Sequence, residues 1–196
     1  MAPLQFWFDF ASTYSYVAAL RIEELAAARG VPLEWKPFLL GPIFQRQGWN
    51  DSPFNLNPIR GRYMWRDIER LCLKYHLPFR PPTQFPRNSL LAARVALVAS
   101  GRDWLPAFVQ AVYRANFAED RDIAAPGVIE EVLRSFGEAD GTLLAAAQTP
   151  ENKERLRRRT EEAWEAGLFG APSFLVDGEL FWGHDRMDDA FDWYKA

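Results

Sequence analysis

Ser12 lies in a stretch whose residue types point to chemistry at a sulfur atom. Residues Phe8 to Tyr16 read FDFASTYSY, in which an apolar run passes Asp9 and reaches the hydroxyl residues Ser12 and Thr13. A helical pattern follows at once, so Ser12 falls at a helix N-terminus, where free N–H groups and the helix dipole stabilise an anion such as a thiolate. Cys72 is the only cysteine of the chain. The pattern therefore predicts that a thiol arrives with a ligand and receives a hydrogen bond from the Ser12 hydroxyl.

The elements around Ser12 are predicted to form a βαβ unit. The aromatic-rich segment Leu4–Phe10 is typical of a strand that is buried on both faces. A helix is expected from about Tyr14 to Arg29, since apolar residues recur at helical spacing and Gly30 follows as a stop signal. The segment Pro32–Phe38 then predicts a second strand, which completes the unit.

The rest of the chain is predicted to be helical until two strands near its end. From Asn57 to Gly167 the pattern indicates a series of helices, with start signals at Asn57, Asn88, Asp103, Pro126 and Thr149. The segments Pro172–Val176 and Glu179–Trp182 flank Asp177-Gly178, a strong hairpin signal. A short helix, Asp188–Tyr194, is expected to follow the hairpin.

This order of elements predicts an α/β protein with a thioredoxin fold, βαβ followed by ββα, and one four-stranded mixed sheet. Residues 1–56 and 168–196 are expected to form the thioredoxin-like domain, and residues 57–167 a large all-helical insertion. Redox proteins of this fold carry C-x-x-C before the first helix, whereas this chain has Ser12-Thr13-Tyr14-Ser15. Because it has no redox pair, disulfide exchange is disfavoured as its activity.

Composition and charge narrow the class of protein further. The chain has 196 residues, 48% of them hydrophobic, and a net charge of −3. That length supports one sizeable core, and the negative charge argues against a nucleic-acid partner. The start of the chain has no signal-peptide pattern, and its longest apolar stretch is too short to span a bilayer. With a single cysteine, these features predict a cytoplasmic protein without a membrane partner.

Four segments together make the chain resemble the 2-hydroxychromene-2-carboxylate isomerases, which are relatives of kappa-class glutathione transferases in the DsbA-like thioredoxin superfamily. The segments are FDFASTYSY, NPIRGRYMWRDIER, FPRNSLLAAR and GLFGAPSFLVDGELFWGHDRMD. The resemblance implies glutathione as the cofactor and a small aromatic substrate in aromatic hydrocarbon catabolism. The implied reaction interconverts 2-hydroxychromene-2-carboxylate and trans-o-hydroxybenzylidenepyruvate, or a related arylidene pyruvate. It also implies a homodimer.

The resemblance assigns roles to residues along the whole chain. Ser12 would face the glutathione sulfur, Asp185 would bind the γ-glutamyl ammonium, and Pro172 would be a cis-proline that exposes the Ala171 backbone for pairing with the glutathione peptide. The implied glutathione-binding set is Ser12, Asn50, Ala171, Pro172, His184, Asp185 and Arg186. The implied substrate-binding set is Arg60, which stands where the family has a lysine near the substrate carboxylate, with Trp35 and Phe38.

The implied chemistry is reversible addition of a thiolate to the conjugated carbon of the substrate, which lets the former double bond rotate before the thiolate leaves. Besides Arg60, the chain departs from the family pattern at Thr13, which stands where Ser-Pro-Tyr has its proline, and His184 and Ala171 are variable positions. Proline at this position pre-sets the first helical turn. Thr13 forgoes that effect and is expected to add a second hydroxyl near the sulfur site.

Structural roles are open for several of these residues. Ser12 or Asp185 could serve only as a helix cap, Pro172 could be a trans proline at a strand start, and Asn50 could be a turn residue. Five aromatic residues could be core or could line the substrate pocket: Trp35, Phe38, Phe44, Trp49 and Phe54.

The sequence also bears on a metal site, on a hydrolase triad and on two other functions. Cys72 and His76 are four apart on a predicted helix, but a metal site needs more ligands, so no metal is expected. Ser12, His184 and Asp185 are unsuited to a hydrolase triad, since two of them are sequence neighbours and no G-x-S-x-G motif is present. A glutathione transferase and a non-catalytic thioredoxin-like binding module stay as alternatives to the isomerase.

Overall fold

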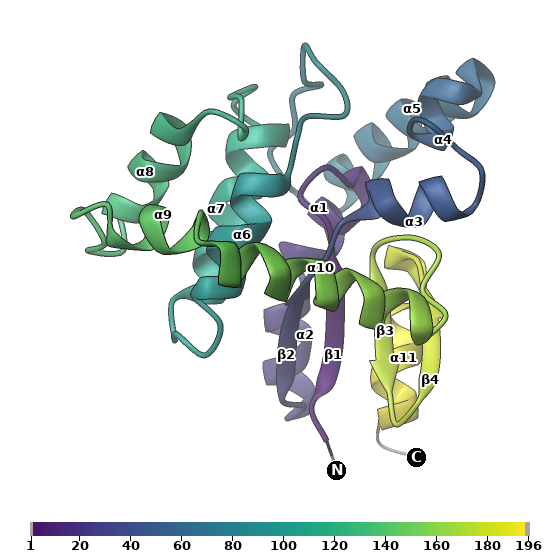
Figure 1. Ribbon diagram of the computed structural model, residues 1–196. Coiled ribbons are helices and arrows are strands. Elements are labelled where there is room, and N and C mark those ends of the chain that lie inside the picture. The colour runs from purple at the N-terminus through teal and green to yellow at the C-terminus, as the bar shows by residue number, and fades with distance from the viewer. Residues whose placement is uncertain (1, 195–196) are drawn as a thin grey trace.

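The computed structural model describes residues 2–194, and four strands form one mixed sheet in the order β2-β1-β3-β4 (Figure 1). Strand β1 (Leu4–Phe8) pairs parallel with β2 (Leu33–Pro37) and antiparallel with β3 (Ser173–Val176), which pairs antiparallel with β4 (Glu179–Trp182). The predicted thioredoxin fold, with βαβ at the start and ββα at the end, is confirmed.

Strand β1 is buried on both faces, as its aromatic composition predicts. On one face Phe6 lies between its sheet partners Trp35 and Phe174, whose ring centroids are 5.0 and 5.5 Å away. On the other face Trp7 packs edge-on against Phe38. These rings fix the register of the sheet, because a slip of one residue would exchange the two faces.

Strand β1 ends two residues earlier than predicted, at Phe8 rather than Phe10. The cause is a turn that Asp9 organises. Its carboxylate accepts a hydrogen bond from the Ala11 N–H at 2.8 Å, and its carbonyl accepts one from the Ser12 N–H at 2.9 Å. The turn directs the chain from the sheet into the first helix.

The helix predicted over Tyr14–Arg29 is two helices, α1 (Thr13–Ala19) and α2 (Ile22–Arg29). The break has an identifiable contact, because the Gln110 side-chain amide donates to the Ala19 carbonyl at 3.2 Å. That carbonyl is thereby hydrogen-bonded to a side chain at the point where α1 ends. The prediction of one continuous helix was wrong at this position.

Between β2 and β3 the described chain is helical, as predicted, and contains no strand. Three of its helices, α3, α4 and α9, were not predicted from the sequence. The helices of this segment are α3 (Leu40–Arg46), α4 (Pro53–Leu56), α5 (Pro58–Lys74), α6 (Leu90–Val98), α7 (Leu105–Phe117), α8 (Pro126–Arg134), α9 (Thr142–Ala147) and α10 (Pro150–Glu165). After β4 follow the short 3-10 helix η1 (His184–Arg186) and α11 (Met187–Tyr194).

Helices cover both faces of the sheet (Figure 1). Helix α10 crosses the face nearer the viewer and contacts β2, α3 and α6, while α11 lies behind β3 and contacts α2. The helical segment therefore packs on the sheet through α10 and α6. The division of the chain into a thioredoxin-like domain and an inserted helical domain, residues 57–167, stays a prediction.

A buried arginine ties the end of β1 to the helical segment. Arg87 donates to both the backbone and side-chain oxygens of Asn116 at 3.1 Å, and it forms an ion pair with Asp120. Asn116 in turn donates to the Phe10 carbonyl at 3.0 Å. Hydrogen bonds to the backbone N–H of Thr83 and to Arg87 hold the pKa of Asp120 below its usual value. The turn that carries Ser12 is thus supported by groups from α7 and the loop after α5.

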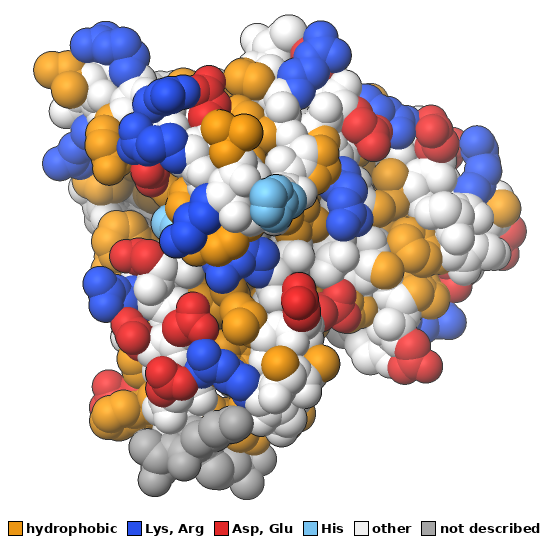
Figure 2. Space-filling view, turned by 180° about the vertical axis from the view of Figure 1, so that it is seen from behind, with side chains coloured by type: hydrophobic (Ala, Val, Ile, Leu, Met, Phe, Trp, Pro, Cys, Tyr) orange, Lys and Arg blue, Asp and Glu red, His pale blue; other side chains and the backbone are white. Residues whose placement is uncertain are grey.

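The surface carries both signs of charge. Figure 2 shows Lys and Arg side chains interspersed with Asp and Glu on the face that it draws, without one large region of a single sign. Among residues 2–194, no helix combines the length and the apolar character that crossing a membrane requires.

Candidate active site

A cavity of about 1160 Å³ opens at the N-terminus of α1. Its walls come from α1, α3, the α4–α5 region and the two ends of the β3–β4 hairpin. Most of the residues with assigned ligand-binding roles line it: Ser12, Asn50, Arg60, Ala171, Pro172, His184, Asp185 and Arg186. Residues far apart in the sequence are therefore brought to one site.

Ser12 is at once the N-cap of α1 and a wall residue of the cavity. Its Oγ accepts a hydrogen bond from the Ser15 N–H at 3.1 Å and donates one to the Ala171 carbonyl at 3.0 Å. The capping role and the ligand-facing role are therefore compatible. Because a hydroxyl has one proton, donation to a ligand sulfur requires the Ser12 O–H to rotate away from Ala171.

The Ala171–Pro172 peptide bond is cis and faces Ser12, as predicted. The segment is held from both sides, since the Gly183 N–H donates to the Pro172 carbonyl and the Ser173 hydroxyl donates to the Gly170 carbonyl, each at 2.9 Å. The Ala171 backbone thus lies at the cavity, where an extended peptide could pair with it.

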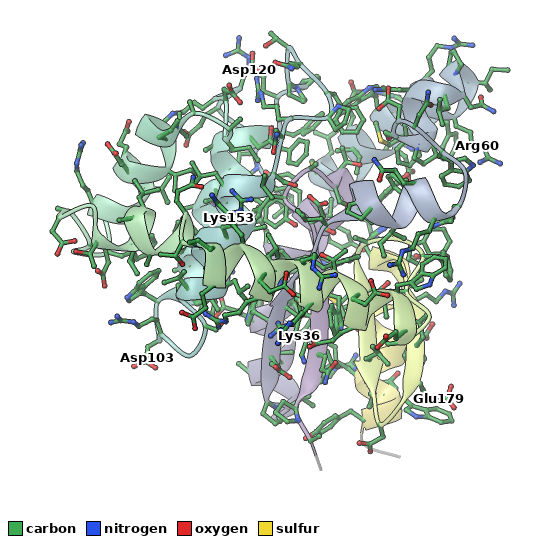
Figure 3. All side chains as sticks on the ribbon, viewed as in Figure 1. Lys36, Arg60, Asp103, Asp120, Lys153 and Glu179 are labelled. Carbon is green, nitrogen blue, oxygen red and sulfur yellow. The ribbon has the colours of Figure 1, made fainter. Side chains whose placement is uncertain are left out.

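The remaining residues with assigned roles sit around the cavity rim. Asp185 is the middle residue of η1, before α11, and its side chain is 61% exposed and 3.8 Å from Arg186. Asn50 and Arg60 are exposed residues that also line the cavity. Figure 3 shows Arg60 on the α3–α5 side of the molecule. The cavity lining therefore offers both acidic and basic side chains to a ligand.

The structure does not bring Trp35 and Phe38 into this cavity. Both are buried in the core, Trp35 against Phe6 and Phe8, and Phe38 against Trp7. Their expected role in substrate binding is corrected accordingly, because their side chains pack on the faces of the sheet. Three other aromatic residues of the group do line the cavity: Phe44, Trp49 and Phe54.

Comparison with known proteins agrees with this geometry. The family model of the DSBA-like thioredoxin domain matches residues 3–194. The chain belongs to this family. A 2-hydroxychromene-2-carboxylate isomerase of Sphingobium xenophagum is 30% identical over 94% of both chains. Glutathione s-transferase kappa 2 of Caenorhabditis elegans is 26% identical over 96% of this chain and 90% of its own.

A solved structure of a 2-hydroxychromene-2-carboxylate isomerase has the same fold, with a TM-score of 0.88 and 23% identity over 99% of this chain and 95% of its own. The cytosolic disulfide reductase DsbM of Pseudomonas aeruginosa, solved with GSH, is more distant, with a TM-score of 0.69 and 17% identity over 99% and 96% of the two chains. Proteins similar in sequence to this chain thus include isomerases and transferases, and the disulfide reductase shares its fold.

The Thr13 hydroxyl does not point to the position beside Ser12 where a second hydroxyl was expected. The side chain is buried, and its Oγ1 donates to the Met64 sulfur at 3.2 Å. The hydroxyl therefore points from α1 towards α5. The expected contribution of Thr13 to the site is corrected to a contact between two helices.

We expect Thr13→Pro to leave activity intact and to change the free energy of unfolding by less than about 1 kcal/mol. Proline at the first helical position raises the free energy of unfolding by about 0.4–1 kcal/mol, and loss of the hydrogen bond to Met64 lowers it by a similar amount. Ser12 has the extended backbone that precedes proline readily, at φ −83° and ψ 119°. Denaturant unfolding measures the change, with Met64→Leu as the matched control. Lost turnover in Thr13→Pro but not in Met64→Leu would contradict this account.

Two residues of the site lacked any signal in the sequence pattern. Tyr14, expected as an apolar position of the helix, is half-buried at the cavity and donates from its hydroxyl to Asp67 Oδ2 at 3.0 Å. Burial and the Asp67 carboxylate raise the Tyr14 pKa, so the phenol is neutral at pH 7. The pairing of Tyr14 with Asp67 depends on how α5 docks on α1, which local sequence does not encode.

Asp9 is the second such residue. It is 3% exposed, and its two carboxylate oxygens accept from the Ala11 N–H at 2.8 Å and the Leu40 N–H at 2.7 Å. Its carbonyl accepts from the Tyr113 hydroxyl at 2.8 Å. Asp9 thus joins the turn before α1 to the first residue of α3. It positions two walls of the cavity.

No group of three His, Cys, Asp or Glu side chains suited to a metal ion occurs in the described part of the chain. Cys72 is buried, and burial raises its pKa to about 11, so the thiol stays protonated at neutral pH. The chemistry of the cavity therefore depends on oxygen and nitrogen groups of the chain and on what a ligand brings.

Proposed function

We propose that this protein is a glutathione-dependent cis–trans isomerase of a 2-hydroxyarylidene pyruvate, with 2-hydroxychromene-2-carboxylate as the cyclic form of its substrate. The observation that carries the proposal is the position of Ser12, whose hydroxyl lies between the N-terminus of α1 and the backbone of Ala171 in one cavity. The named relatives support an isomerase or a transferase that uses glutathione.

The residues of the cavity fit glutathione. Ser12 and the N-terminus of α1 suit an ionised sulfur, the Ala171 backbone suits the peptide, and the exposed Asp185 carboxylate suits the γ-glutamyl ammonium. Asn50 lies on the same cavity and offers an amide to the remaining polar groups. Bound glutathione would supply the thiolate that adds to the substrate and leaves again.

The chain's own groups would hold the thiolate and orient the substrate. The Ser12 hydroxyl would donate to the sulfur and favour its ionised form near pH 7. The Arg60 guanidinium, which lines the same cavity, would pair with the substrate carboxylate. A cavity of about 1160 Å³ exceeds the usual volume for a drug-sized ligand, so an aryl group has room to rotate beside glutathione. By resemblance to its family, the chain is also proposed to form a homodimer, which sedimentation tests.

The main alternative is a kappa-like glutathione transferase, which the similarity to the Caenorhabditis elegans protein favours. The two functions differ in what happens to glutathione. An isomerase regenerates it in each cycle, whereas a transferase consumes one thiol for each product. A non-catalytic binding module would support neither turnover.

In the test, we expect isomerisation of a 2-hydroxyarylidene pyruvate to saturate with glutathione while the titre of free thiol stays constant. S-methylglutathione should bind without supporting turnover, because it cannot form a thiolate. Substrate absorbance and thiol titre are followed in one reaction. Thiol consumed in step with product would establish the transferase, and undiminished isomerisation without any thiol would overturn the proposal.

A further inference from the structure

His184 lies on the cavity wall, stacked on Tyr14. The two rings are nearly parallel, with an interplanar angle of 12° and centroids 5.2 Å apart. Tyr14 is two residues from Ser12 on α1, and the Tyr14 hydroxyl is fixed by its hydrogen bond to Asp67. The stack therefore fixes the His184 imidazole on the wall of the cavity that Ser12 also lines.

The ring nitrogens of His184 make no hydrogen bond to another side chain or backbone group within the described residues. The imidazole is partly buried and lines the cavity, so a ligand can reach it. The ring nitrogens are open to the cavity rather than enclosed by the protein, so water or a bound molecule can be their partner.

Charged groups of both signs surround His184. Burial lowers its pKa, the carboxylates of Asp185 and Asp67 oppose that effect, and Arg21 and Lys74 add to it. Tyr14, the other titratable group against the ring, is neutral. The imidazole is therefore uncharged near pH 7, with one nitrogen that accepts a proton and one that donates.

We propose that His184 is the acid–base residue that opens and closes the ring of an ortho-hydroxyaryl substrate, an inference that rests on the proposed function. The cyclic substrate is a hemiketal, in which one carbon carries the ring oxygen, a hydroxyl group and the carboxylate. His184 accepts the proton of that hydroxyl group. The hydroxyl oxygen then becomes the oxygen of a C=O bond, and the bond from the same carbon to the ring oxygen breaks. The imidazolium then returns the proton to the phenolate oxygen. No electron is gained or lost, and the open form is an isomer of the cyclic one.

Ring opening and thiolate addition take place at different atoms of the substrate. Thiolate addition takes place at the conjugated carbon beside the aryl ring and depends on Ser12. Ring opening takes place at the phenolic oxygen and depends on His184. An arylidene pyruvate without the ortho hydroxyl group cannot form the ring, so it needs Ser12 but not His184. This difference separates the two roles experimentally.

The kinetic experiment compares His184→Phe and His184→Gln with wild type on two substrates. Phenylalanine keeps an aromatic ring against Tyr14 and removes both nitrogens, while glutamine keeps hydrogen bonding and cannot carry a proton. In both variants we expect turnover of the ortho-hydroxylated substrate, measured at saturating glutathione, to fall about 100-fold more than turnover of benzylidenepyruvate. His76→Asn, which changes the other histidine at an exposed position outside the cavity, is the control. Equal losses on both substrates would overturn the acid–base role and leave the proposed isomerase intact.

The binding experiment does not depend on turnover. Wild type should bind 2-hydroxycinnamate at least fivefold more tightly than cinnamate by calorimetry, and the C–H proton resonances of His184 should shift only with the hydroxylated compound. His184→Phe should lose the preference, and His184→Gln should keep part of it. Equal binding of both compounds by wild type would overturn the placement of the phenolic oxygen at His184. A wild type that isomerises neither substrate with glutathione would instead overturn the proposed function.

Discussion

Ser12→Ala is expected to raise the thiol pKa of bound glutathione by about one to two units. The variant loses one hydrogen bond to a charged acceptor, which contributes about 1.5–3 kcal/mol, and 1.36 kcal/mol corresponds to about one pKa unit. Since the hydroxyl must first leave the Ala171 carbonyl, the lower half of this range is favoured. Turnover near neutral pH should fall by about 10-fold for each unit that the pKa rises above the working pH, and should recover at higher pH. The pH dependence of thiolate absorbance and of turnover measures both.

The control for this prediction must separate the loss of a helix cap from the loss of a sulfur contact. Thr149 caps α10 as Ser12 caps α1, with its Oγ1 accepting from the Asn152 N–H at 3.2 Å, and it lies outside the cavity. Thr149→Ala should therefore lose about 1 kcal/mol of stability without a change in turnover. Ser12→Thr keeps a hydroxyl and should restore most of the activity. Wild-type turnover and thiol pKa in Ser12→Ala would mean that the N-terminus of α1 alone holds the thiolate.

The parts of the fold with local signals were predictable from the sequence. The Asp177-Gly178 turn between two apolar runs predicted the β3–β4 hairpin, and the Asn57-Pro58 cap predicted the start of α5, where the structure places both. The helix N-terminus at Ser12 follows from the same local rules. A cap and a turn depend on neighbours in the chain, so a short segment is enough to predict them.

Two helices, α3 and α9, could not be predicted because their local sequence signals are conflicting or too short. Helix α3 begins Leu40-Gly41-Pro42, which is typical of a turn, although proline is well tolerated in the first turn of a helix. Its first N–H group is satisfied by Asp9, which no local pattern indicates. Helix α9 has six residues, too few for a helical period to be distinguished. Both helices depend on packing against other parts of the chain.

Local rules alone pointed to Ser12, because the strand–helix junction fixes its position. Pro172 and the other cavity residues were assigned only through the resemblance to a family. Trp35 and Phe38 were misplaced, because their burial against Phe6 and Trp7 depends on how the strands and helices pack together, which the local sequence does not encode. The stack of Tyr14 on His184 joins two distant segments, and the order of residues in either one does not predict it.

Asp9→Asn is expected to lower the free energy of unfolding by about 1–3 kcal/mol, the cost of one buried donor without an acceptor. The carboxylate accepts from Ala11 and Leu40 with separate oxygens. An amide has one oxygen, so its NH₂ group must face one of these two N–H groups. The start of α3 or the turn before α1 then shifts, and glutathione affinity should fall with stability. Asp103→Asn, at an exposed position labelled in Figure 3, is the matched control and should change neither.

The pH dependence of this variant distinguishes the charge of Asp9 from its hydrogen bonds. Burial raises the pKa of Asp9 above its usual value, against the backbone N–H of Leu40, the Ser89 side chain and the backbone N–H of Ala11, which lower it. A carboxyl group whose pKa is raised in the folded state binds its proton more tightly when the protein is folded. Its stabilising contribution is therefore complete below the pKa of the unfolded state, near 3.8, and is lost as the pH rises through the pKa of the folded state. Asparagine has no such dependence. The loss of stability in Asp9→Asn relative to wild type should therefore be largest in acid and smaller at pH 7. Denaturant unfolding at both pH values measures this loss. A loss that grows towards neutral pH would mean that the ionised carboxylate stabilises the fold.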